Sequence, residues 1–93
     1  MFVAEMNFRQ YERVVKGFAN HRRIEILSLL KINPELSLDE ISTRLKINMK
    51  TASEHVRRLA ISGLVLKRSE GNSVRHKLTR RAESILKFLR TLE

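Results

Sequence analysis

Cysteine and tryptophan are absent from this sequence, and its 93 residues include only one proline and three glycines. Without cysteine, the chain can form neither disulfides nor metal sites built on thiolates. No stretch approaches the ~20 consecutive apolar residues that a membrane-spanning helix needs. The start of the sequence lacks the basic segment and apolar run of a signal peptide. We therefore expect a soluble, cytoplasmic protein that does not associate with a membrane.

The length of the chain limits its architecture. Ninety-three residues are enough for one domain and too few for two. A domain of this size buries only about 60–65% of the surface that its unfolded chain exposes, so a monomer would be marginally stable. Because disulfides are excluded, a second copy of the chain is the natural source of further stability. We expect one domain over residues 1–93 that forms a homodimer.

Positive charge is in excess and unevenly placed. The chain has 19 Lys and Arg against 10 Asp and Glu, which gives a net charge of +9. Residues 1–43 contain six basic and six acidic residues, whereas residues 44–93 contain thirteen basic and four acidic ones. Charge gathered in one half of a small domain indicates a surface for a polyanion such as nucleic acid. A solvated basic surface without a partner is the alternative.

Two helices are predicted in the neutral half of the chain. Apolar residues recur at helical spacing over residues 5–18 and again over His21–Ile32. Asn20 is a suitable N-cap for the second helix. Asn33 and Pro34 end it, because proline disfavours helical geometry in the residue before it.

Two more helices follow, separated by a short turn. Ser37 and Glu40 have the spacing of a capping box, which predicts a helix over residues 37–45. Asn48 is a good cap for the next helix, which we expect over residues 49–62. Gly63 suits the left-handed position that commonly follows a helix C-terminus.

The period of the pattern then changes from helix to strand. Residues 64–68 and 73–78 are predicted to form two strands around the turn Glu70-Gly71-Asn72, which is the signal of a β-hairpin. Thr79 caps a last helix over residues 79–92. Its apolar residues Ala82, Ile85, Leu89 and Leu92 have the 3-4-3 spacing of a seam between two helices. Packing against the core of its own monomer is the alternative.

The third and fourth predicted helices, joined by Lys46-Ile47-Asn48, have the pattern of a helix-turn-helix. In such a motif the second helix recognises DNA, and it needs an apolar back and a polar front that enters the major groove. Ala52, Val56, Leu59 and Ala60 supply the back. The front that we expect to contact DNA comprises Met49, Lys50, Thr51, Ser53, Glu54, Arg57 and Arg58. An ordinary amphipathic helix with a solvated face is the alternative.

Position along this helix separates base contacts from phosphate contacts, because residues near the N-terminus of a recognition helix reach base edges. The bases are expected to be contacted by Met49, Lys50, Ser53 and Glu54. A Glu54 carboxylate can accept a hydrogen bond from the cytosine amine, and Lys50 can donate to guanine or to phosphate. Arg57 and Arg58 come later in the helix and are expected to meet phosphate.

The predicted hairpin, which we call the wing, offers a second contact with DNA. The residues expected there are Lys67, Arg68, Asn72, Ser73, Arg75 and Lys77. Contacts of this kind, along the DNA backbone or minor groove, add affinity and salt dependence more than sequence choice. Basic residues also protect exposed edge strands, and the two interpretations are compatible. The predicted fold is mainly α with a β-hairpin (α+β): a winged helix-turn-helix with the element order α-α-α-α-β-β-α.

From Asn20 to Leu78 the sequence resembles the ArsR-type winged-helix repressors, and the broader MarR-like group less closely. The matching segments are HRRIEILSLL at 21–30, the stretch over 36–65 and the end of the wing over 76–79. Within them Ser53, His55, Leu59, Gly63, Leu64 and Val65 follow the family pattern S-x-H-x-x-x-L-x-x-x-G-L-V. The resemblance implies that His55 contacts the DNA backbone or supports the motif.

The same resemblance implies a homodimer formed by the first and last helices, over residues 5–18 and 79–92. Two recognition helices would then enter successive major grooves, about 10 bp apart. The residues expected at the dimer interface are Phe8, Tyr11, Val15, Ile85, Phe88, Leu89 and Leu92.

The sequence departs from the family pattern at its metal sites and its wing. Members that sense soft metals often carry E-L-C-V-C-D-L where this chain has Ser37 and Asp39 in place of both thiols, and the last helix has no histidine. His21, His55 and His76 fall in different elements, so we expect no metal and no cofactor. In the wing, Asn72 stands where the family often has Arg, and Arg75 and His76 replace aromatic residues. The sequence does not indicate whether the wing tip enters the minor groove.

Catalysis has little support, because the chain lacks a glycine-rich phosphate loop, a cysteine nucleophile and a Ser-His-Asp pattern. We predict a sequence-specific DNA-binding transcriptional regulator, a homodimeric repressor without thiolate metal sensing. Its partners would be double-stranded DNA and a second copy of itself, and a small-molecule effector stays open. The alternatives are a non-specific or architectural nucleic-acid-binding protein and a winged-helix module that binds protein. Neither the operator, the regulated genes nor the sign of regulation follows from the sequence.

Overall fold

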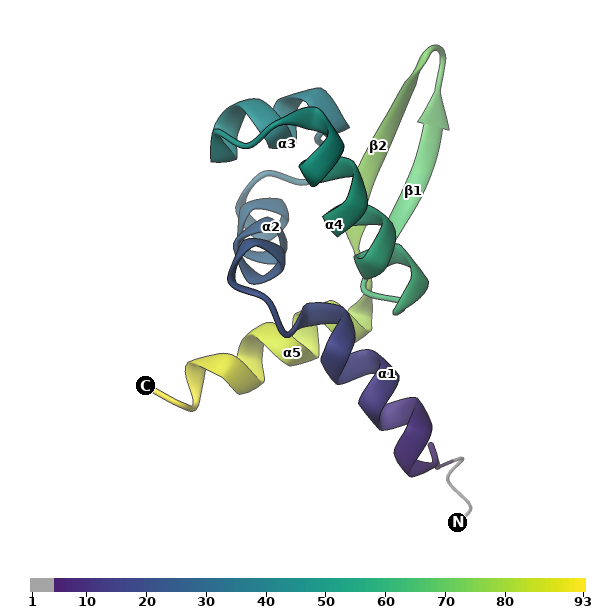
Figure 1. The fold of residues 1–93 in the computed structure, drawn as a ribbon, viewed down its shortest axis with the longest axis vertical. Helices are drawn as coiled ribbons and strands as arrows, with labels where there is room; N and C mark the ends of the chain where they lie inside the picture. Colours follow the sequence, from purple (N-terminus) through teal and green to yellow (C-terminus); the bar gives the residue numbers. More distant parts are fainter. Residues whose placement is uncertain (1–4) are drawn as a thin grey trace.

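The computed structural model describes residues 5–93 and contains, over these residues, five helices and one two-stranded antiparallel sheet (Figure 1). The helices are α1 (Phe8–Phe18), α2 (His21–Ile32), α3 (Leu38–Leu45), α4 (Met49–Ile61) and α5 (Arg80–Arg90), and the strands are β1 (Val65–Glu70) and β2 (Ser73–Leu78). This order confirms the predicted fold class. Residues 1–4 of the predicted domain lie outside the described residues. None of the helices within residues 5–93 combines the length and the apolar composition needed to cross a membrane.

Side-chain caps determine where the helices begin. Asn20, Asn48 and Thr79 accept hydrogen bonds from first-turn N–H groups of α2, α4 and α5, as predicted. Ahead of α3, Glu40 N–H donates to Ser37 Oγ over 3.2 Å, and Ser37 N–H donates to Glu40 Oε1 over 2.9 Å. These caps pair backbone donors that a helix N-terminus would otherwise leave without a partner.

The first and last helices are shorter than predicted. α1 begins at Phe8 rather than at residue 5, because Asn7 and Gln10 form a second capping box. Gln10 N–H donates to Asn7 Oδ1 over 2.9 Å, and Asn7 N–H donates to Gln10 Oε1 over 2.8 Å. α5 ends at Arg90 rather than at residue 92. The remaining bounds agree with the predicted ones or differ by one or two residues.

α2 is the central helix of the core. Ile26, Leu27 and Leu30 are almost completely buried, whereas Ile24, which lies on the predicted apolar stripe, is half-buried. The helix-turn-helix and the hairpin add Ile41, Val56, Leu59, Leu64, Val65 and Leu78 to this core. In contrast, Gly17 is the buried residue of α1 and Ala82 that of α5. The terminal helices therefore flank the core and leave much of their apolar surface outside it.

The wing is joined to the loop before α3 by backbone hydrogen bonds. β1 and β2 pair in antiparallel register along their whole length, around a turn in which Gly71 has a φ of +59°. On the other edge of β2, Glu35 N–H donates to His76 O over 2.9 Å, and His76 N–H donates to Leu36 O over 3.0 Å. The wing tip lies at one end of the molecule, and α1 and α5 lie at the opposite end (Figure 1).

Candidate nucleic-acid interface

The turn between α3 and α4 is tight because Lys46 takes a left-handed conformation, with a φ of +57°. Its N–H donates to Thr43 O over 3.3 Å, and Ile47 N–H donates to Ser42 O over 3.0 Å. Such a backbone is uncommon for lysine, and nothing in the sequence marks Lys46 for it. Ser42 Oγ also lies 3.3 Å from Met49 Sδ, which holds the first residue of α4 against α3.

The two faces of α4 are arranged as predicted. Of the residues predicted for its back, Ala52, Val56 and Leu59 are buried in the core, and Ala60 is half-buried. The exposed side is formed by Met49, Lys50, Thr51, Ser53, Glu54, Arg57 and Arg58. The helix therefore presents a largely polar face from the turn that joins it to α3 as far as Arg58, and its last residue, Ile61, exposes an apolar side chain.

Glu54 binds both arginines of this face. Arg57 donates from Nη2 and Nε to the two carboxylate oxygens over 2.6 and 3.2 Å, and Arg58 Nε donates to Glu54 Oε1 over 3.2 Å. These hydrogen bonds lower the pKa of Glu54 and raise that of Arg57. The residue expected to contact a base is thus bound to the residues expected to contact phosphate.

His55 faces away from this polar side. It is half-buried, and its Nδ1 accepts a hydrogen bond from Arg23 Nε over 3.3 Å. Burial lowers the pKa of His55, and the positive charge of Arg23 adds to this effect. The neutral imidazole therefore connects α4 to α2, which is a supporting position rather than one on the exposed face.

Arg23 and Gly17 fasten the end of α1 to the other helices. Arg23 Nη1 donates to the carbonyl oxygens of Lys16 and Gly17 over 2.9 and 3.0 Å. A Cβ atom at Gly17 would overlap the side chain of Ser62, which follows α4. The absence of a side chain at Gly17 thus allows α1 to lie directly against the C-terminal end of the recognition helix.

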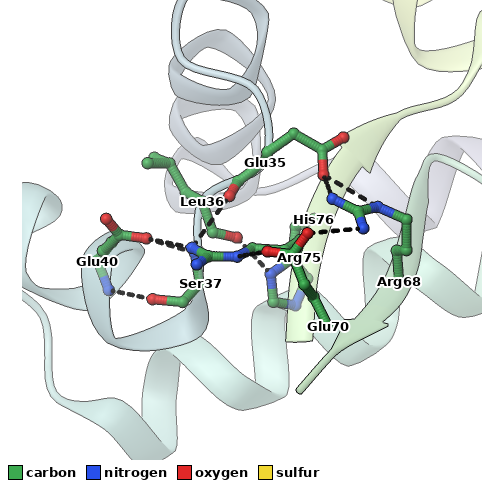
Figure 2. Close-up of polar contacts among 8 residues, drawn as sticks. All are labelled: Glu35, Leu36, Ser37, Glu40, Arg68, Glu70, Arg75 and His76. Carbon is green, nitrogen blue, oxygen red and sulfur yellow. Dashed lines mark hydrogen bonds and ion pairs between the residues drawn. The ribbon is translucent and has the colours of Figure 1, made fainter. Parts of the chain in front are cut away.

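The two arginines of the wing are bound by Glu70 of the wing itself and by two carboxylates outside it, Glu35 and Glu40 (Figure 2). Arg68 Nε donates to Glu35 Oε1 over 3.2 Å, and its Nη1 donates to Glu70 Oε2 over 3.1 Å. Arg75 Nη1 donates to Glu40 Oε1 over 3.2 Å, and its Nε lies 3.4 Å from Glu70 Oε1. The cluster connects both strands of the wing to the loop before α3 and to the first turn of α3.

The ion pairs and hydrogen bonds of this cluster shift the pKa values of three of its members. Hydrogen bonds to Glu35 and Glu70 raise the pKa of Arg68, and those from Arg68 lower the pKa of Glu70. The capping bonds of Ser37 lower the pKa of Glu40, with a smaller contribution from Arg75. These shifts favour the charged forms of Arg68, Glu40 and Glu70.

The remaining wing residues are more accessible. Lys67, Lys77 and Asn72 are exposed, and the two lysines form no ion pair within residues 5–93. Ser73 is half-buried beside the turn. The wing also exposes two apolar side chains, Leu66 and Val74, which the sequence analysis did not single out. The four basic residues among the predicted wing contacts thus divide into two unpaired lysines and two arginines with carboxylate partners.

His76 lies at the point where the wing meets the loop before α3. Its side chain is 2% exposed, and its Nδ1 lies 2.8 Å from Leu36 O. Burial lowers the pKa of His76, which keeps the imidazole neutral near pH 7. Together, the three histidines lie on separate elements, and no group of three or more His, Asp or Glu within residues 5–93 is placed to hold a metal ion.

The terminal helices expose most of the apolar residues predicted for a dimer interface. On α1, Phe8 is 90% exposed, and Tyr11 and Val15 are about half exposed, at 49% and 51%. Phe88 on α5 and Leu92 just beyond it are 56% and 67% exposed. Ile85 and Leu89 of the same prediction are half-buried, and Ile85 packs against the monomer core.

Comparisons with known proteins agree with this architecture. Residues 18–68 match a family model described as a helix-turn-helix domain. The chain is 36% identical over 83 residues to the transcriptional activator HlyU of Vibrio cholerae serotype O1, a match that covers 82% of this chain and 76% of HlyU. It is 42% identical over 62 residues to the HTH-type transcriptional regulator Rv0324 of Mycobacterium tuberculosis, covering 67% of this chain and 27% of that longer protein.

Solved structures show the same fold. The winged helix-turn-helix domain of Mb0332 from Mycobacterium bovis, described as homodimeric and as a possible ArsR-family regulator, superposes with a TM-score of 0.81 at 29% identity, over 97% of this chain and 89% of that one. HlyU from Vibrio cholerae N16961 gives a TM-score of 0.80 at 33% identity, over 96% and 97% of the two chains. These relatives are transcriptional regulators, not enzymes. The chain belongs to the ArsR-type winged helix-turn-helix transcriptional regulators.

Proposed function

We propose that this protein binds a specific DNA sequence as a homodimer and regulates transcription from that site, most simply as a repressor that occludes a promoter. The observation that carries the proposal is the start of α4. There Lys50, Thr51 and Ser53 are exposed, and their side chains form no hydrogen bond or ion pair within residues 5–93. Free donors and acceptors at the N-terminus of a recognition helix are what the recognition of base edges requires.

The proposal divides the polar surface between two tasks. Base contacts are assigned to Met49, Lys50, Thr51, Ser53 and Glu54. Phosphate contacts are assigned to Arg57, Arg58, Lys67 and Lys77, with Asn72 and Ser73 near the wing tip. His55 supports the motif from behind through its bond to Arg23. The base contacts determine which DNA sequence is bound, whereas the phosphate contacts supply affinity and fix the register of the protein on the duplex.

A homodimer is supported by the exposed apolar residues of α1 and α5. Each large apolar side chain that becomes fully buried contributes about 1.5–3 kcal/mol, so covering Phe8, Phe88 and Leu92 with a second copy would stabilise the protein substantially. The Mb0332 domain, which has the same fold, is described as homodimeric. Because α1 and α5 lie opposite the wing tip (Figure 1), a partner bound there would leave both recognition helices accessible.

Substitutions on these helices test the dimer. Phe8→Glu together with Phe88→Glu places charges on the most exposed part of the surface without entering the core, and we expect monomers in sedimentation velocity. Leu66→Glu is the matched control, since Leu66 is 59% exposed but lies on the wing. An unchanged dimer in the double variant would contradict the α1 and α5 interface.

Regulation by thiolate-bound metal is not part of the proposal, because the sequence has no cysteine. A signal would be a small ligand, a partner protein or the abundance of the regulator itself. We also propose that the protein acts in the cytoplasm, the location expected from its sequence. HlyU is named an activator, so the sign of regulation is tested separately, by a reporter that carries the selected site upstream of its promoter or overlapping it.

The first test of the proposal is selection of bound sequences from a random duplex library, in moderate salt and with competitor DNA. We expect a pseudo-palindromic site with half-sites about 10 bp apart. A variant with Lys50→Ala and Ser53→Ala should still retain DNA but lose this enrichment. Retention without enrichment by the unmodified protein would instead indicate an architectural role, and no retention would indicate a protein-binding module.

A further inference from the structure

The carboxylates around the wing arginines outnumber them. Glu35, Glu40 and Glu70 surround Arg68 and Arg75 in a connected set of ion pairs, so the five charges sum to −1. Figure 2 shows the Arg75 side chain between Glu40 on one side and Glu70 on the other. Although both arginines increase the net charge of the protein, this cluster as a whole does not attract a phosphate.

The ion pairs cross between segments that are far apart in the chain. Arg68 and Glu35 are 33 residues apart, and Arg75 and Glu40 are 35 residues apart. The side chain of Arg75 is 30% exposed, the least among the paired cations and carboxylates of the described residues. β1 is thereby tied to the loop before α3, and β2 to the first turn of α3, the first helix of the DNA-binding motif.

Backbone geometry at Glu35 supports the same interpretation. Glu35 has a φ of +68°, a left-handed conformation that is disfavoured for a residue with a Cβ. In this conformation its N–H bonds to His76 O on β2, while its carboxylate reaches Arg68 on β1. A glycine would adopt this backbone more easily, but it would lose the bond to Arg68.

We propose that Arg68 and Arg75 are positioning residues. With Glu35, Glu40 and Glu70 they form an ionic clasp that holds the wing at a fixed angle to the helix-turn-helix, and the phosphate contacts of the wing are made by Lys67 and Lys77. This inference rests on the proposed DNA binding. It changes the roles expected from sequence, since two basic residues of the wing act inside the protein and two acidic residues outside the wing support DNA affinity.

If the clasp exists, removing one of its negative charges should weaken DNA binding, which is the opposite of what charge alone predicts. Removing a negative charge near DNA ordinarily strengthens binding to the polyanion. Glu35→Gln and Glu40→Gln should instead weaken it, because each releases a wing arginine. Gln at position 40 can still form the capping box, so the variant removes the ion pair and leaves the cap of α3 in place.

Asp39→Asn is the matched control. Asp39 is exposed, adjacent to Glu40 and without an ion pair within residues 5–93. We expect Glu35→Gln and Glu40→Gln each to lower affinity for the selected duplex about two- to fivefold, the range of modest ion-pair effects, while Asp39→Asn leaves it unchanged or raises it. If all three variants bind more tightly, the clasp is wrong.

The salt dependence of binding separates the arginines from the lysines. The slope of log K against log salt falls by about 0.9 for each phosphate contact that is lost. Lys67→Gln and Lys77→Gln should each reduce the slope by about this amount. Arg68→Gln and Arg75→Gln should weaken binding with the slope unchanged. A drop of the full amount in either arginine variant would assign that arginine to phosphate and overturn its positioning role.

Amide hydrogen exchange in the free protein tests the clasp without DNA. The N–H groups of Glu35 and His76 form the bonds between the loop before α3 and the wing. Their exchange should become several-fold faster in Arg75→Gln and Glu40→Gln and stay unchanged in Asp39→Asn, with the N–H of buried Leu27 as an internal reference. Unchanged exchange in all variants would overturn the clasp even if DNA binds. If exchange becomes faster in Arg75→Gln and Glu40→Gln but the unmodified protein binds no duplex, the clasp stands and only the proposed function is contradicted.

Discussion

The recognition helix and the wing both carry two arginines bound to carboxylates, but the partners lie at different distances along the chain. Arg57 and Arg58 bind Glu54, three and four residues away on the same helix. Outside the wing, Arg68 binds Glu35 and Arg75 binds Glu40, and each of these partners is more than thirty residues away in the chain. The first arrangement sets side-chain rotamers on one element, whereas the second sets the position of one element relative to another.

This difference determines what DNA can change. Exposed pairs within a helix contribute little net stability, so a phosphate can replace Glu54 as the partner of Arg57 and Arg58 without affecting the fold. Releasing the arginines of the wing would loosen the wing relative to α3, because only the backbone hydrogen bonds of Glu35 and His76, the His76 side chain and packing would then hold it. We therefore expect substitutions in α4 to change DNA binding directly and those in the clasp to change it through the wing.

The largest expected effect is on the packing that holds the far end of the recognition helix. Gly17→Ala gains about 0.5–1 kcal/mol from helix propensity, but its Cβ would overlap Cβ as well as Oγ of Ser62, which requires α1 or α4 to move. Overpacking of this kind costs about 1–3 kcal/mol, so we expect a net loss of stability. Thermal unfolding at a fixed protein concentration measures it, since the stability of a dimer depends on concentration.

Ser62→Gly is the partner variant for this test. It removes the atoms that would overlap, so Gly17→Ala should cost much less in its presence, and the double-mutant cycle should show a clear coupling. The cost should also be independent of salt, unlike that of releasing the clasp, because it arises from packing rather than charge. Additive effects of Gly17→Ala and Ser62→Gly would contradict the close contact between α1 and α4.

The next effect is the loss of phosphate contacts at α4. Arg57→Gln with Arg58→Gln should reduce the slope of log K against log salt by about two units and weaken binding more than tenfold at physiological salt, equally for specific and random duplexes. Fluorescence anisotropy over a range of salt concentrations measures both. Arg22→Gln is the control, since Arg22 is paired with Glu25 in the same way on α2. An unchanged slope of log K against log salt would mean that Arg57 and Arg58 contact no phosphate and bind only Glu54.

Most of the fold follows from local signals in the sequence. Ser37, Asn48 and Thr79 each have a capping side chain placed just ahead of a periodic apolar segment, and the helices begin after them. The apolar spacing alone places the start of α1 too early, at residue 5 rather than at Phe8. The pair Asn7 and Gln10, three residues apart, was the available signal.

The candidate site was predictable only where it depends on one element. The polar front of α4 repeats with the helical period, so its exposed residues could be named from the sequence. The partners of Arg68 and Arg75 could not, because they depend on how a loop more than thirty residues earlier in the chain meets the wing. The left-handed backbone of Glu35 and Lys46 has no sequence signal either, since tertiary contacts impose it on residues that disfavour it.

A smaller effect is expected when the pH is lowered below about 6.5, the ordinary pKa of histidine. Burial lowers the pKa of His76, and Lys67 on the paired strand adds to the effect. Burial beside Arg23 likewise lowers the pKa of His55. The unfolded chain therefore takes up protons at a higher pH than the folded one, so stability is full above about pH 6.5 and decreases as the pH falls below it.

Unfolding temperature measured between about pH 7 and pH 5 should fall by a few degrees, and His76→Gln and His55→Gln should each reduce the fall. The lowered pKa values of Glu40 and Glu70 keep these two carboxylates of the clasp charged in this window. Only His76→Gln should also remove the pH dependence of the protection factor of Glu35 N–H, the exchange rate relative to that of an unfolded chain at the same pH, which reports on the contact between the wing and the loop before α3. An unfolding temperature that rises as the pH falls would contradict the direction of both pKa shifts.

The smallest effect concerns Glu54, where the two tasks of the recognition helix meet. Glu54→Gln retains the shape of the side chain but removes the charge that binds Arg57 and Arg58. An amide donates as well as accepts hydrogen bonds, whereas a carboxylate only accepts, so base preference should shift at one position of each half-site. Affinity for random duplexes should rise by about twofold, since the two arginines lose a competitor for phosphate.

Parallel selections with the unmodified protein and the variant measure the shift in preference, and Glu25→Gln is the control because it breaks an equivalent local pair outside α4. If Glu54 contacts a base, its variant changes which sequences are enriched, and Glu25→Gln does not. If affinity rises for all duplexes while the enriched sequence stays the same, Glu54 serves only to hold its arginines. Specificity would then depend on Met49, Lys50, Thr51 and Ser53, whose side chains have no carboxylate partner within residues 5–93.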